Sequence, residues 1–518
     1  MSIAIRFNGV DFCDIQQCAC DAEFIPQCVQ YDTDDIKGKI LRRFLDEVES
    51  DSLLLCINNP DEFGNNETLY NKGDGKGFIA DFNQNMFGGV IGVVKKCIHF
   101  AQGEFDLSLP ETDIDIDVTL QLQTRFDKND FGNNEQRPYF LLSMIMAMTG
   151  IQLSNNDIPS DEAGLFDFLL ISLFKKQLSV FSTKGYFRAY QNFYNNDDRI
   201  KGSIDIARHI KTNMGMMNGR ISYTYRNKSV DNYFNHLILA TYTYIKGKYP
   251  QLTLDIIDSD QEVYNAIKIL GYSIEYPKYD IRTIVNKNLN PIAHPYYIEY
   301  EFLRTICLRI LRNETAGFFD GTGDSVQGVL FYVPRLWELF VKDLFYKYLH
   351  EKNFISQDKN DVFAYNNKES RALTIIPDYV FYENKTPYMI LDAKFKPKWG
   401  EQVSRHNSIS MLRDDYDECI RNMNAFNAHA TGVIFPSSIE IDKNDMKHSI
   451  SEYNTFDAFY TIPLYVPRVE NDESFIDWKE KFYKYCQDTI CILEDFLDLE
   501  KELNAKIYAT FQYLALNR

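Results

Sequence analysis

One stretch of the chain, Thr374–Lys398, does most to limit what the surrounding residues can fold into. It contains two runs rich in aromatic and β-branched residues, Ile375–Tyr382 and Tyr388–Phe395, and such runs are typical of β-strands. Residues 383–387, Glu-Asn-Lys-Thr-Pro, separate the two runs and have the composition of a turn. The stretch therefore predicts a β-hairpin around which a domain is built.

Three charged side chains on this hairpin are placed so that they can meet. Asp378 follows a proline on the first strand, and Asp392 and Lys394 lie two residues apart on the second. Side chains alternate between the faces of a strand, so Asp392 and Lys394 point to the same side. Two carboxylates can hold Mg²⁺, and a lysine beside the metal can orient water or stabilise charge on a phosphate. The alternative interpretation is a solvated hairpin with an ordinary ion pair.

The segments around the hairpin predict an α/β order of elements. The expected elements are a helix at Pro334–Leu349, the hairpin, a helix at Ile409–Ala428, strands at Gly432–Pro436 and Tyr460–Val466, and C-terminal helices within Phe475–Leu516. Glu338 lies among apolar residues on the first of these helices. It is either a solvated helix residue or a further carboxylate for the metal.

The first 135 residues predict a mixed, β-rich region. The expected elements are a helix at Ile36–Val48 and strands at Leu53–Ile57, Val90–Val94 and Ile114–Leu122. From Pro138 the pattern is mainly helical, with helices at Tyr139–Met148, Leu165–Phe181, Asn235–Tyr244 and Tyr296–Leu311. Ser259 and Glu262 have the spacing of a capping box at the start of another helix, and Gly271 is its expected C-cap.

Charge is distributed unevenly along the chain, whose net charge is −19. Residues 1–130 hold 11 Lys and Arg against 24 Asp and Glu, a net of −13, whereas residues 184–228 hold 9 against 3, a net of +6. The acidic N-terminal part repels nucleic acid and suggests a protein partner, although acidity also serves simple solubility.

The cysteine spacing and the hydropathy of the chain indicate its cellular compartment. Cys13, Cys18, Cys20 and Cys28 cluster without a Cys-x-x-Cys pair, so buried thiols are a better interpretation than a zinc site. No run of eighteen apolar residues occurs, and the first residues lack the apolar segment of a signal peptide. These features predict a soluble cytoplasmic protein with no membrane partner.

Several short motifs, taken in order, resemble the McrC family, the nuclease subunits of McrBC-type and LlaJI-type restriction systems. The motifs are Lys184-Gly185-Tyr186 with Arg188 and Tyr190; Lys201-Gly202-Ser203-Ile204-Asp205; Ser229 with Asp231 and Asn235; Leu336–Val341 with Glu338; and the hairpin residues Asp378, Asp392 and Lys394. The resemblance extends over residues 138–436. Many members have a Gln-x-x-x-Tyr motif on the helix after the hairpin, and here Asn422 and Phe426 stand in its place.

The resemblance implies a fold and a domain order. The fold is an α/β C-terminal PD-(D/E)xK nuclease core, preceded by a helical middle region and a β-rich N-terminal domain. The implied boundaries are residues 1–135 for the acidic N-terminal domain, 136–316 for the middle region with its basic segment, and 325–518 for the endonuclease domain.

The resemblance also implies a reaction and its residues. Asp378, Asp392, Lys394 and Glu338 would form the catalytic set, and the three carboxylates would hold Mg²⁺, with Mn²⁺ as a possible substitute. Double-stranded DNA would be the substrate. Phosphate contacts are expected from a second group of basic residues: Lys396, Lys398 and Arg405.

The implied partner is a McrB-like AAA+ GTPase hexamer that recognises modified DNA, such as DNA containing 5-methylcytosine, and translocates it. The acidic residues 1–135 are the predicted docking region for this motor, with the basic segment 184–228 as the next candidate. Two other functions stay open: a stand-alone repair or mobile-element nuclease, and a non-catalytic adaptor that activates an NTPase. The intact hairpin residues argue against the adaptor.

Overall fold

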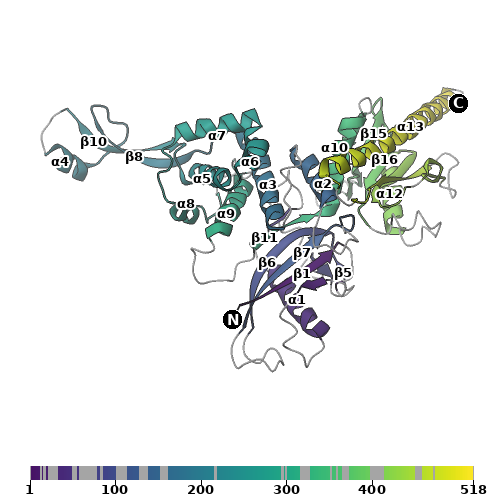
Figure 1. The fold of residues 1–518 in the computed structure, drawn as a ribbon. Coiled ribbons are helices and arrows are strands. Elements are labelled where there is room, and N and C mark those ends of the chain that lie inside the picture. The colour runs from purple at the N-terminus through teal and green to yellow at the C-terminus, as the bar shows by residue number, and fades with distance from the viewer. Residues whose placement is uncertain are drawn as a thin grey trace. The chain divides into compact units, whose positions relative to one another are not determined.

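The computed structural model describes these residues: 2–11, 15, 19–21, 33–49, 55–57, 79–81, 86–100, 114–127, 138–151, 162–214, 219–292, 297, 300–315, 327–349, 353–357, 360–363, 373–396, 399, 413–440, 442–449, 458–470 and 473–516. They divide into two compact units (Figure 1). The first unit is built from the described parts of 1–60, 66–166 and 323–518, and the second from those of 167–322. The fold is mixed α/β with several sheets.

The first unit contains a six-stranded sheet in the order β2-β1-β7-β6-β11-β3. Its strands are β1 (Ser2–Val10), β2 (Ala19–Asp21), β3 (Leu55–Ile57), β6 (Val90–Phe100), β7 (Ile114–Gln123) and β11 (Gln327–Tyr332). β1 and β7 run parallel, and β6 is antiparallel to both β7 and β11. The strands expected near residues 53–57, 90–94 and 114–122 are confirmed. β11, however, reaches this sheet from the segment assigned to the nuclease domain.

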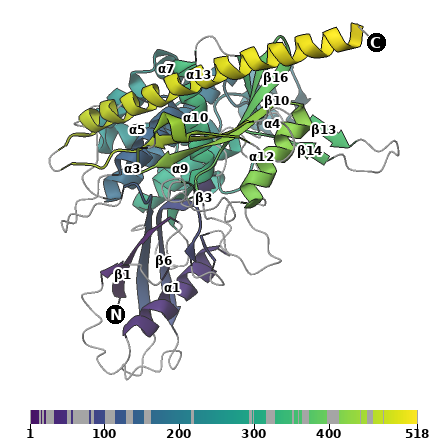
Figure 2. The same cartoon turned by 90° about the vertical axis from the view of Figure 1, so that its right-hand side faces the viewer.

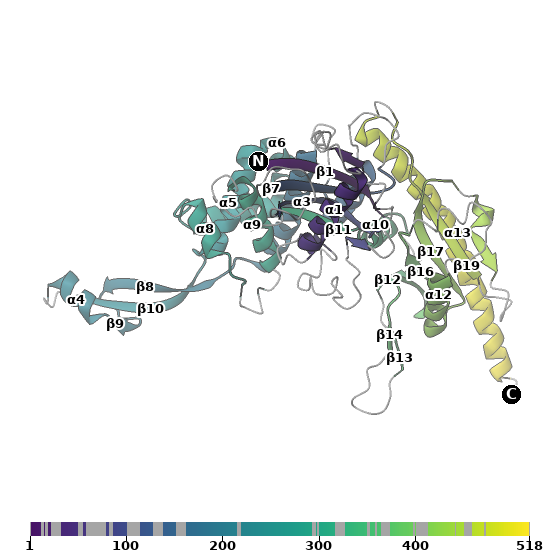
Figure 3. The same ribbon diagram turned by 90° about the horizontal axis from the view of Figure 1, so that it is seen from below.

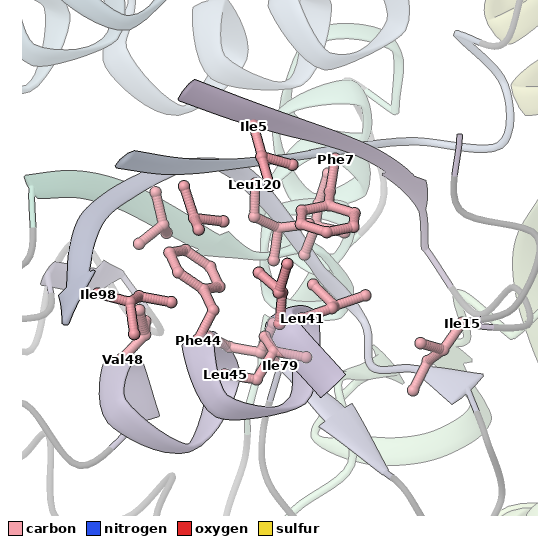
Figure 4. Packing of buried hydrophobic residues seen from close by; sticks show 14 of the residues in the cluster. Ile5, Phe7, Ile15, Leu41, Phe44, Leu45, Val48, Ile79, Ile98 and Leu120 are labelled. Atoms are coloured by element: carbon pink, nitrogen blue, oxygen red, sulfur yellow. The ribbon is translucent and has the colours of Figure 1, made fainter. Parts of the chain in front are cut away.

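Helix α1 (Thr33–Glu49) covers one face of this sheet. Its Leu41, Phe44 and Leu45 are buried against Phe7 of β1 and Leu120 of β7 (Figure 4). Apolar and polar residues alternate along β7, so one face of the strand lies in the core. The helix expected at 36–48 is therefore confirmed. The short pair β4 (Ala80–Asp81) and β5 (Met86–Phe87) adds Phe87 to the same core.

A second six-stranded sheet in this unit has the order β12-β15-β16-β17-β19-β18. Its strands are β12 (Asn353–Ser356), β15 (Tyr379–Glu383), β16 (Thr386–Ala393), β17 (Ala430–Ser437), β18 (Lys447–Ser449) and β19 (Ala458–Tyr465). β16, β17 and β19 are parallel neighbours, and β15 is antiparallel to β16. The expected order of helix, two hairpin strands, helix and strand is confirmed by α10 (Val333–Tyr348), β15, β16, α12 (Arg413–Phe426) and β17.

Helices cover both faces of the second sheet. Phe459 of β19 packs in a cluster with Cys419 of α12, whereas the ring of the next residue, Tyr460, packs at a tilt against that of Phe496 of α13. Successive strand residues face opposite ways, so α12 and α13 lie on opposite faces, as Figure 2 shows. Phe340 of α10 stacks on Phe482 of α13, which places α10 on the α13 side.

The C-terminal segment is one helix and not several. α13 runs from Phe475 to Leu516 without a break, because no proline interrupts it and its buried residues recur with helical spacing. Glu500 of this helix is fully buried, and it accepts hydrogen bonds from Tyr460 at 2.5 Å and from Lys447 at 3.0 Å. This contact fixes the helix against β18 and β19. No helix in the described part of the chain combines the length and the apolar character needed to cross a membrane.

The hairpin is shorter than its sequence suggests. The run expected at 375–382 is divided: β14 (Leu373–Ile375) pairs with β13 (Asn360–Phe363), and β15 begins only at Tyr379. Pro377 has no N–H to donate, which explains the interruption. The turn is also tighter than expected, since Asn384 and Lys385 alone connect the strands, both with positive φ.

The second unit combines helices with a small sheet. The helices are α3 (Glu162–Lys184), α5 (Tyr233–Lys248), α6 (Pro250–Leu252), the π-helix η5 (Thr253–Asp258), α7 (Gln261–Ser273), α8 (Ile281–Lys287) and α9 (Tyr300–Thr315). The expected capping box is wrong: Asp260 caps α7 by accepting the N–H groups of Glu262 and Val263. Asp260 directly precedes Gln261, the first residue of α7, and so takes the N-cap position that was expected for Ser259. Gly271 lies inside α7, which ends at Ser273, so the expected C-cap is also wrong.

The basic segment of the second unit forms a three-stranded sheet, which the expectation of a mostly helical region did not include. β8 (Ala189–Asp197) pairs antiparallel with β10 (Ile221–Ser229), and β9 (Ser203–Ile204) pairs with β10. Helix α4 (Ile206–Asn213) follows β9. Figure 3 shows β8 and β10 leading away from α5, α8 and α9, with α4 and β9 at the far end. We call residues 189–229 the arm.

Some residues that the sequence predictions name lie outside the described residues. Cys13, Cys18 and Cys28 of the cysteine cluster are not among them, and neither are Lys398 and Arg405.

Candidate active site

The strand register brings the two hairpin aspartates together. Tyr379 of β15 is opposite Leu391 of β16, so Asp378, one residue before β15, is next to Asp392. The N–H of Asp378 donates to Asp392 Oδ1 at 3.3 Å. In return, the N–H of Ala393 donates to Asp378 Oδ2 at 2.8 Å. Each carboxylate is therefore oriented by a main-chain group of the neighbouring segment.

Asp392 is almost fully buried and is held from three sides. Its Oδ2 accepts a hydrogen bond from Asn422 Nδ2 at 3.2 Å, lies 3.7 Å from Cys419 Sγ and lies 3.7 Å from Lys394 Nζ. Burial raises the pKa of Asp392 above its ordinary value, and the Lys394 ammonium opposes this increase. Asn422, which stands where many McrC-like sequences have glutamine, thus reaches the site.

Lys394 lies between two carboxylates. Its Nζ is 2.8 Å from Glu418 Oε2 of α12 as well as 3.7 Å from Asp392. Burial by itself would lower the pKa of this lysine, but the attraction of Asp392 and Glu418 outweighs burial and raises it. Lys394 is therefore held as a charged ammonium. Its backbone N–H donates to Ile434 O at 2.9 Å, which attaches it to the centre of the sheet.

Glu338 faces the same place from α10. Its carboxylate pairs with Arg335, three residues earlier on the helix, and its main-chain carbonyl accepts the hydroxyl of Tyr379 at 2.5 Å. Burial raises the pKa of Glu338, Arg335 opposes the rise, and the charge of Asp392 adds to it. The Glu338 side chain is 23% exposed to solvent. Glu338 is thus not on a solvated face of its helix.

The carboxylates of Asp378, Asp392 and Glu338 lie close enough for their charges to affect one another's pKa. The pKa of Asp378 is raised well above its ordinary value, by burial first and then by the charges of Glu338 and Asp392. A cation would relieve this repulsion, and an all-oxygen set suits a hard divalent ion. Among the described residues, however, no three His, Cys, Asp or Glu side chains are grouped closely enough to hold a metal. The fit is therefore to Asp378 and Asp392 as two protein ligands, with further positions left for water or phosphate.

Of the three basic residues expected to contact DNA, the structure describes Lys396. Lys396 has an exposed side chain, but its Nζ is 2.6 Å from Asp415 Oδ1, and Trp399 Nε1 donates to the other oxygen of Asp415 at 3.1 Å. Lys396 is therefore already paired with a buried carboxylate. Lys398 and Arg405, the other two candidates, lie outside the described residues.

Sequence reasoning missed Glu418, Cys419 and Arg335. The helix that carries Glu418 was expected, and Glu418 and Asn422 are four residues apart, a spacing that puts both on one face. Arg335 is three residues before Glu338, so this pair also had a helical signal. Cys419 gave no signal, since a buried cysteine commonly acts as a small apolar residue.

The fold and the site define a mixed α/β protein with a buried cluster of acidic residues and one lysine at the end of two strands. Residues 112–417, more than half of the chain, match the family described as McrBC 5-methylcytosine restriction system component. The chain belongs to this family. The resemblance noted in the sequence is thereby confirmed.

Other comparisons add little to this assignment. A comparison with curated proteins gives no match. The solved half-complex from the tetradecameric assembly of Thermococcus gammatolerans McrB AAA+ hexamers with bound McrC is 14% identical, covers 95% of this chain and 100% of that chain, and has a TM-score of 0.43. The cryo-EM structure of the Thermococcus gammatolerans McrBC complex is 12% identical. The match covers 67% of this chain and 88% of that chain, with a TM-score of 0.28. With TM-scores this low, neither likeness carries a structural argument.

Proposed function

We propose that this chain is the Mg²⁺-dependent DNA endonuclease subunit of a McrBC-type restriction system, with a PD-(D/E)xK core formed by α10, β15, β16, α12 and β17. One observation carries the proposal. Asp378 and Asp392, each oriented by a main-chain N–H, meet the ammonium of Lys394 at the ends of two paired strands. Membership in a restriction-system family agrees with this chemistry.

Each residue has a role that follows from its surroundings. Asp378 and Asp392 would bind the metal, and Glu338 would hold a further ligand or a water. A bound Mg²⁺ would supply Lewis acidity toward the phosphate and an acidified water. Lys394, kept charged by Asp392 and Glu418, would orient the attacking water and stabilise the phosphate charge that develops during cleavage. Asn422 fixes the Asp392 oxygen that lies nearest to Lys394.

Cleavage is tested with plasmid DNA that contains 5-methylcytosine, incubated with the purified chain, a McrB-type partner, GTP, and Mg²⁺ or Mn²⁺. We expect double-strand breaks that EDTA abolishes. The matched control is Asp392→Asn in the same complex. If the Asp392→Asn complex cuts as well as the wild type, the site is wrong. If the wild type stimulates GTP hydrolysis but never cuts, the non-catalytic adaptor is the better description.

The contact with the AAA+ partner is proposed to lie on the arm rather than on residues 1–135. Large apolar side chains are exposed along the arm and at its end: Tyr190, Tyr194, Ile200, Ile204, Ile206, Ile210 and Met214. Met214 alone is 84% exposed. Among the residues of 1–127 whose side-chain burial is described, no large apolar side chain has such exposure. Concentrated exposed apolar surface usually marks a protein interface.

The base of the arm is held in a way that suits a docking element. Asn232 and Asn235, at the start of α5, both donate from Nδ2 to Phe187 O at 2.9 Å, just before β8. Asp231, just after β10, accepts from His236 at 2.6 Å and from Lys278 at 2.9 Å. Both ends of the arm are thus attached to the helices. Asp231 and Asn235 of the Ser229, Asp231 and Asn235 motif thus belong to the base of the arm.

Two variants separate the arm from the acidic N-terminal region as the docking surface. Ile206→Glu with Ile210→Glu alters the end of the arm, and Asp46→Lys with Asp117→Lys reverses two exposed acidic residues of the N-terminal region without removing its sheet. The control is Ile269→Glu, an exposed isoleucine on α7 in the same unit as the arm. Co-elution with the partner and stimulated GTP hydrolysis should be lost only in the arm variant. Loss only in the variant with Asp46→Lys and Asp117→Lys would place the contact on the N-terminal region.

A further inference from the structure

Arg125 and Asp11 form an ion pair just after the last residues of β1 and β7, two inner strands of the N-terminal sheet. β1 and β7 run parallel and in register to their last residues, Val10 and Gln123, so the residues that follow them emerge side by side. The N–H of Asp11 donates to Gln123 O at 2.9 Å, and Asp11 Oδ1 accepts the N–H of Arg125 at 2.5 Å. Asp11 Oδ2 accepts from Arg125 Nη1 at 2.9 Å. The guanidinium is therefore fixed in direction by a carboxylate that has no exposure to solvent.

The other edge of the same guanidinium reaches the catalytic strand. Arg125 Nη2 donates to the carbonyl oxygen of Phe395 at 2.9 Å. The guanidinium also lies over the rings of Phe395 and Phe126, 4.5 and 4.6 Å from their centres. Phe395 directly follows Lys394. Arg125 therefore contacts both the carbonyl and the ring of the residue after the catalytic lysine.

The contact between Arg125 and Phe395 lies just beyond the end of β16. β16 ends at Ala393, and the N–H of Lys394 makes the next backbone hydrogen bond, to Ile434 O at 2.9 Å. Trp337 Nε1 donates to the same carbonyl at 3.2 Å, which fixes that acceptor as well. Beyond this point, the Phe395 carbonyl takes its hydrogen bond from Arg125. The backbone on each side of Lys394 is thus held by a different element.

We infer that Arg125 is a positioning residue for the catalytic lysine, and that the Asp11–Arg125 pair makes the N-terminal sheet part of the machinery that places Lys394 for cleavage. The inference rests on the proposed nuclease function. Arg125 contacts the carbonyl and the ring of Phe395, so it acts through the backbone that follows Lys394. Misplacing a reacting group by about 1 Å costs roughly 10²-fold in rate. Loss of this contact should therefore lower the rate of the chemical step and leave DNA binding unchanged.

The first test compares cleavage by complexes that contain Arg125→Lys, Arg125→Ala or the control Arg43→Ala. Lysine keeps a positive charge for Asp11, but it lacks the planar fork that also reaches Phe395 O. Arg43 is the matched control, because it pairs with Glu47 at 3.1 Å and lies over the ring of Phe100 in the same sheet region. We expect kcat for Arg125→Lys to fall roughly 10- to 100-fold with unchanged KM for DNA. Arg43→Ala should cleave as the wild type does.

The second test needs neither metal nor DNA. Amide hydrogen exchange of a peptide that covers residues 386–396 should be faster in Arg125→Lys than in the wild type, with α1 peptides unchanged. Slow exchange and normal kcat in Arg125→Lys would overturn the inference, as would equal losses in kcat and DNA affinity. If the wild type itself does not cleave, the proposed function fails, but the exchange measurement still decides whether Arg125 holds the strand end.

Discussion

Asp378 and Asp392 each receive a main-chain hydrogen bond from the other's segment, at 2.8 Å from Ala393 N to Asp378 and at 3.3 Å from Asp378 N to Asp392. Asn422 and Lys394 add side-chain contacts to Asp392. Burial raises the pKa of both carboxyl groups, and the charges of Glu338 and Asp392 raise that of Asp378 further. A bound divalent cation would offset this cost, as the proposed metal-assisted hydrolysis requires.

Replacing either aspartate should remove cleavage and leave the fold intact. Asp378→Asn, Asp392→Asn and Lys394→Ala are each expected to reduce the cleavage rate by about 10³-fold or more, because the metal ligands and the ammonium act as one unit. The measurement is linearisation of methylated plasmid over time, together with co-elution with the partner. Asp417→Asn, an exposed aspartate on the neighbouring α12, is the control and should cut normally. Robust cleavage by Asp392→Asn would refute the assignment.

Glu338→Gln should slow cleavage more than it changes stability. The side chain is mostly buried, and its charge is felt by both Asp378 and Asp392, so the amide should weaken metal or water binding without emptying the space. A loss of roughly 10- to 100-fold in rate is expected. Asp343→Asn, a partly buried acid on the same helix, is the control. Equal thermal midpoints with a normal rate in Glu338→Gln would show that this glutamate serves only its Arg335 ion pair.

The sequence could indicate Asp378, Asp392 and Lys394 because their relation is local. Residues two apart on a strand share a face, and a tight turn places the neighbouring strand beside them. Glu418 and Arg125 could not be found in this way. They reach Lys394 and Phe395 from segments 24 and 270 residues away, and no local periodicity records which distant elements will pack together.

The same limit applies to the fold. Helices α1, α10 and α12 were expected because each has an apolar stripe with helical spacing, and α2 (Tyr139–Thr149) was expected from its compact apolar run. β11, in contrast, crosses from the nuclease segment into the N-terminal sheet, where Leu330 pairs with Gly92. A strand's own pattern shows that it will be paired, but not with which partner. The sheet of the arm was missed because β8 is rich in Asn and other polar residues and has no β-branched residue, so its composition is not that of a typical strand.

Asn422 should tune the metal affinity of the site. Its Nδ2 donates to Asp392 Oδ2, and hydrogen bonds that orient a metal ligand typically change affinity or activity by about 10–100-fold. Asn422→Ala is therefore expected to raise the Mg²⁺ concentration for half-maximal cleavage about tenfold. The control is Asn424→Ala, an exposed asparagine two residues further along α12. An unchanged Mg²⁺ dependence in Asn422→Ala would mean that Asp392 needs no such support.

Asp127 should make stability fall as the pH rises. This buried carboxylate accepts hydrogen bonds from Phe140 N, Leu141 N and Thr124 Oγ1, yet burial raises its pKa to about 7. The folded protein therefore holds a proton that the unfolded chain releases near pH 4. The unfolding free energy should decrease from about pH 4 to about pH 7, by at most about 4 kcal/mol from this group.

The variant Asp127→Asn isolates this effect, because an amide keeps an acceptor for α2 without titrating. The thermal midpoint of the wild type relative to Asp127→Asn should fall between pH 5 and pH 8. Other titrating groups are common to both proteins and cancel in the difference. A constant difference across this range would show that Asp127 is ionised throughout.

Gly202 should be required for the shape of the arm. A Cβ at this position would lie 2.3 Å from Thr224 O and 2.7 Å from the Cβ of Tyr225, so alanine would push β9 away from β10. Overpacking of this kind costs about 1–3 kcal/mol, and here the strain is confined to the end of the arm. Gly202→Ala is expected to weaken partner binding at least about tenfold.

Gly271→Ala, on α7 of the same unit and with open space around it, is the control. Binding of the partner is measured by titration of stimulated GTP hydrolysis. Normal stimulation by Gly202→Ala, with the variant folded, would remove the arm from the docking surface.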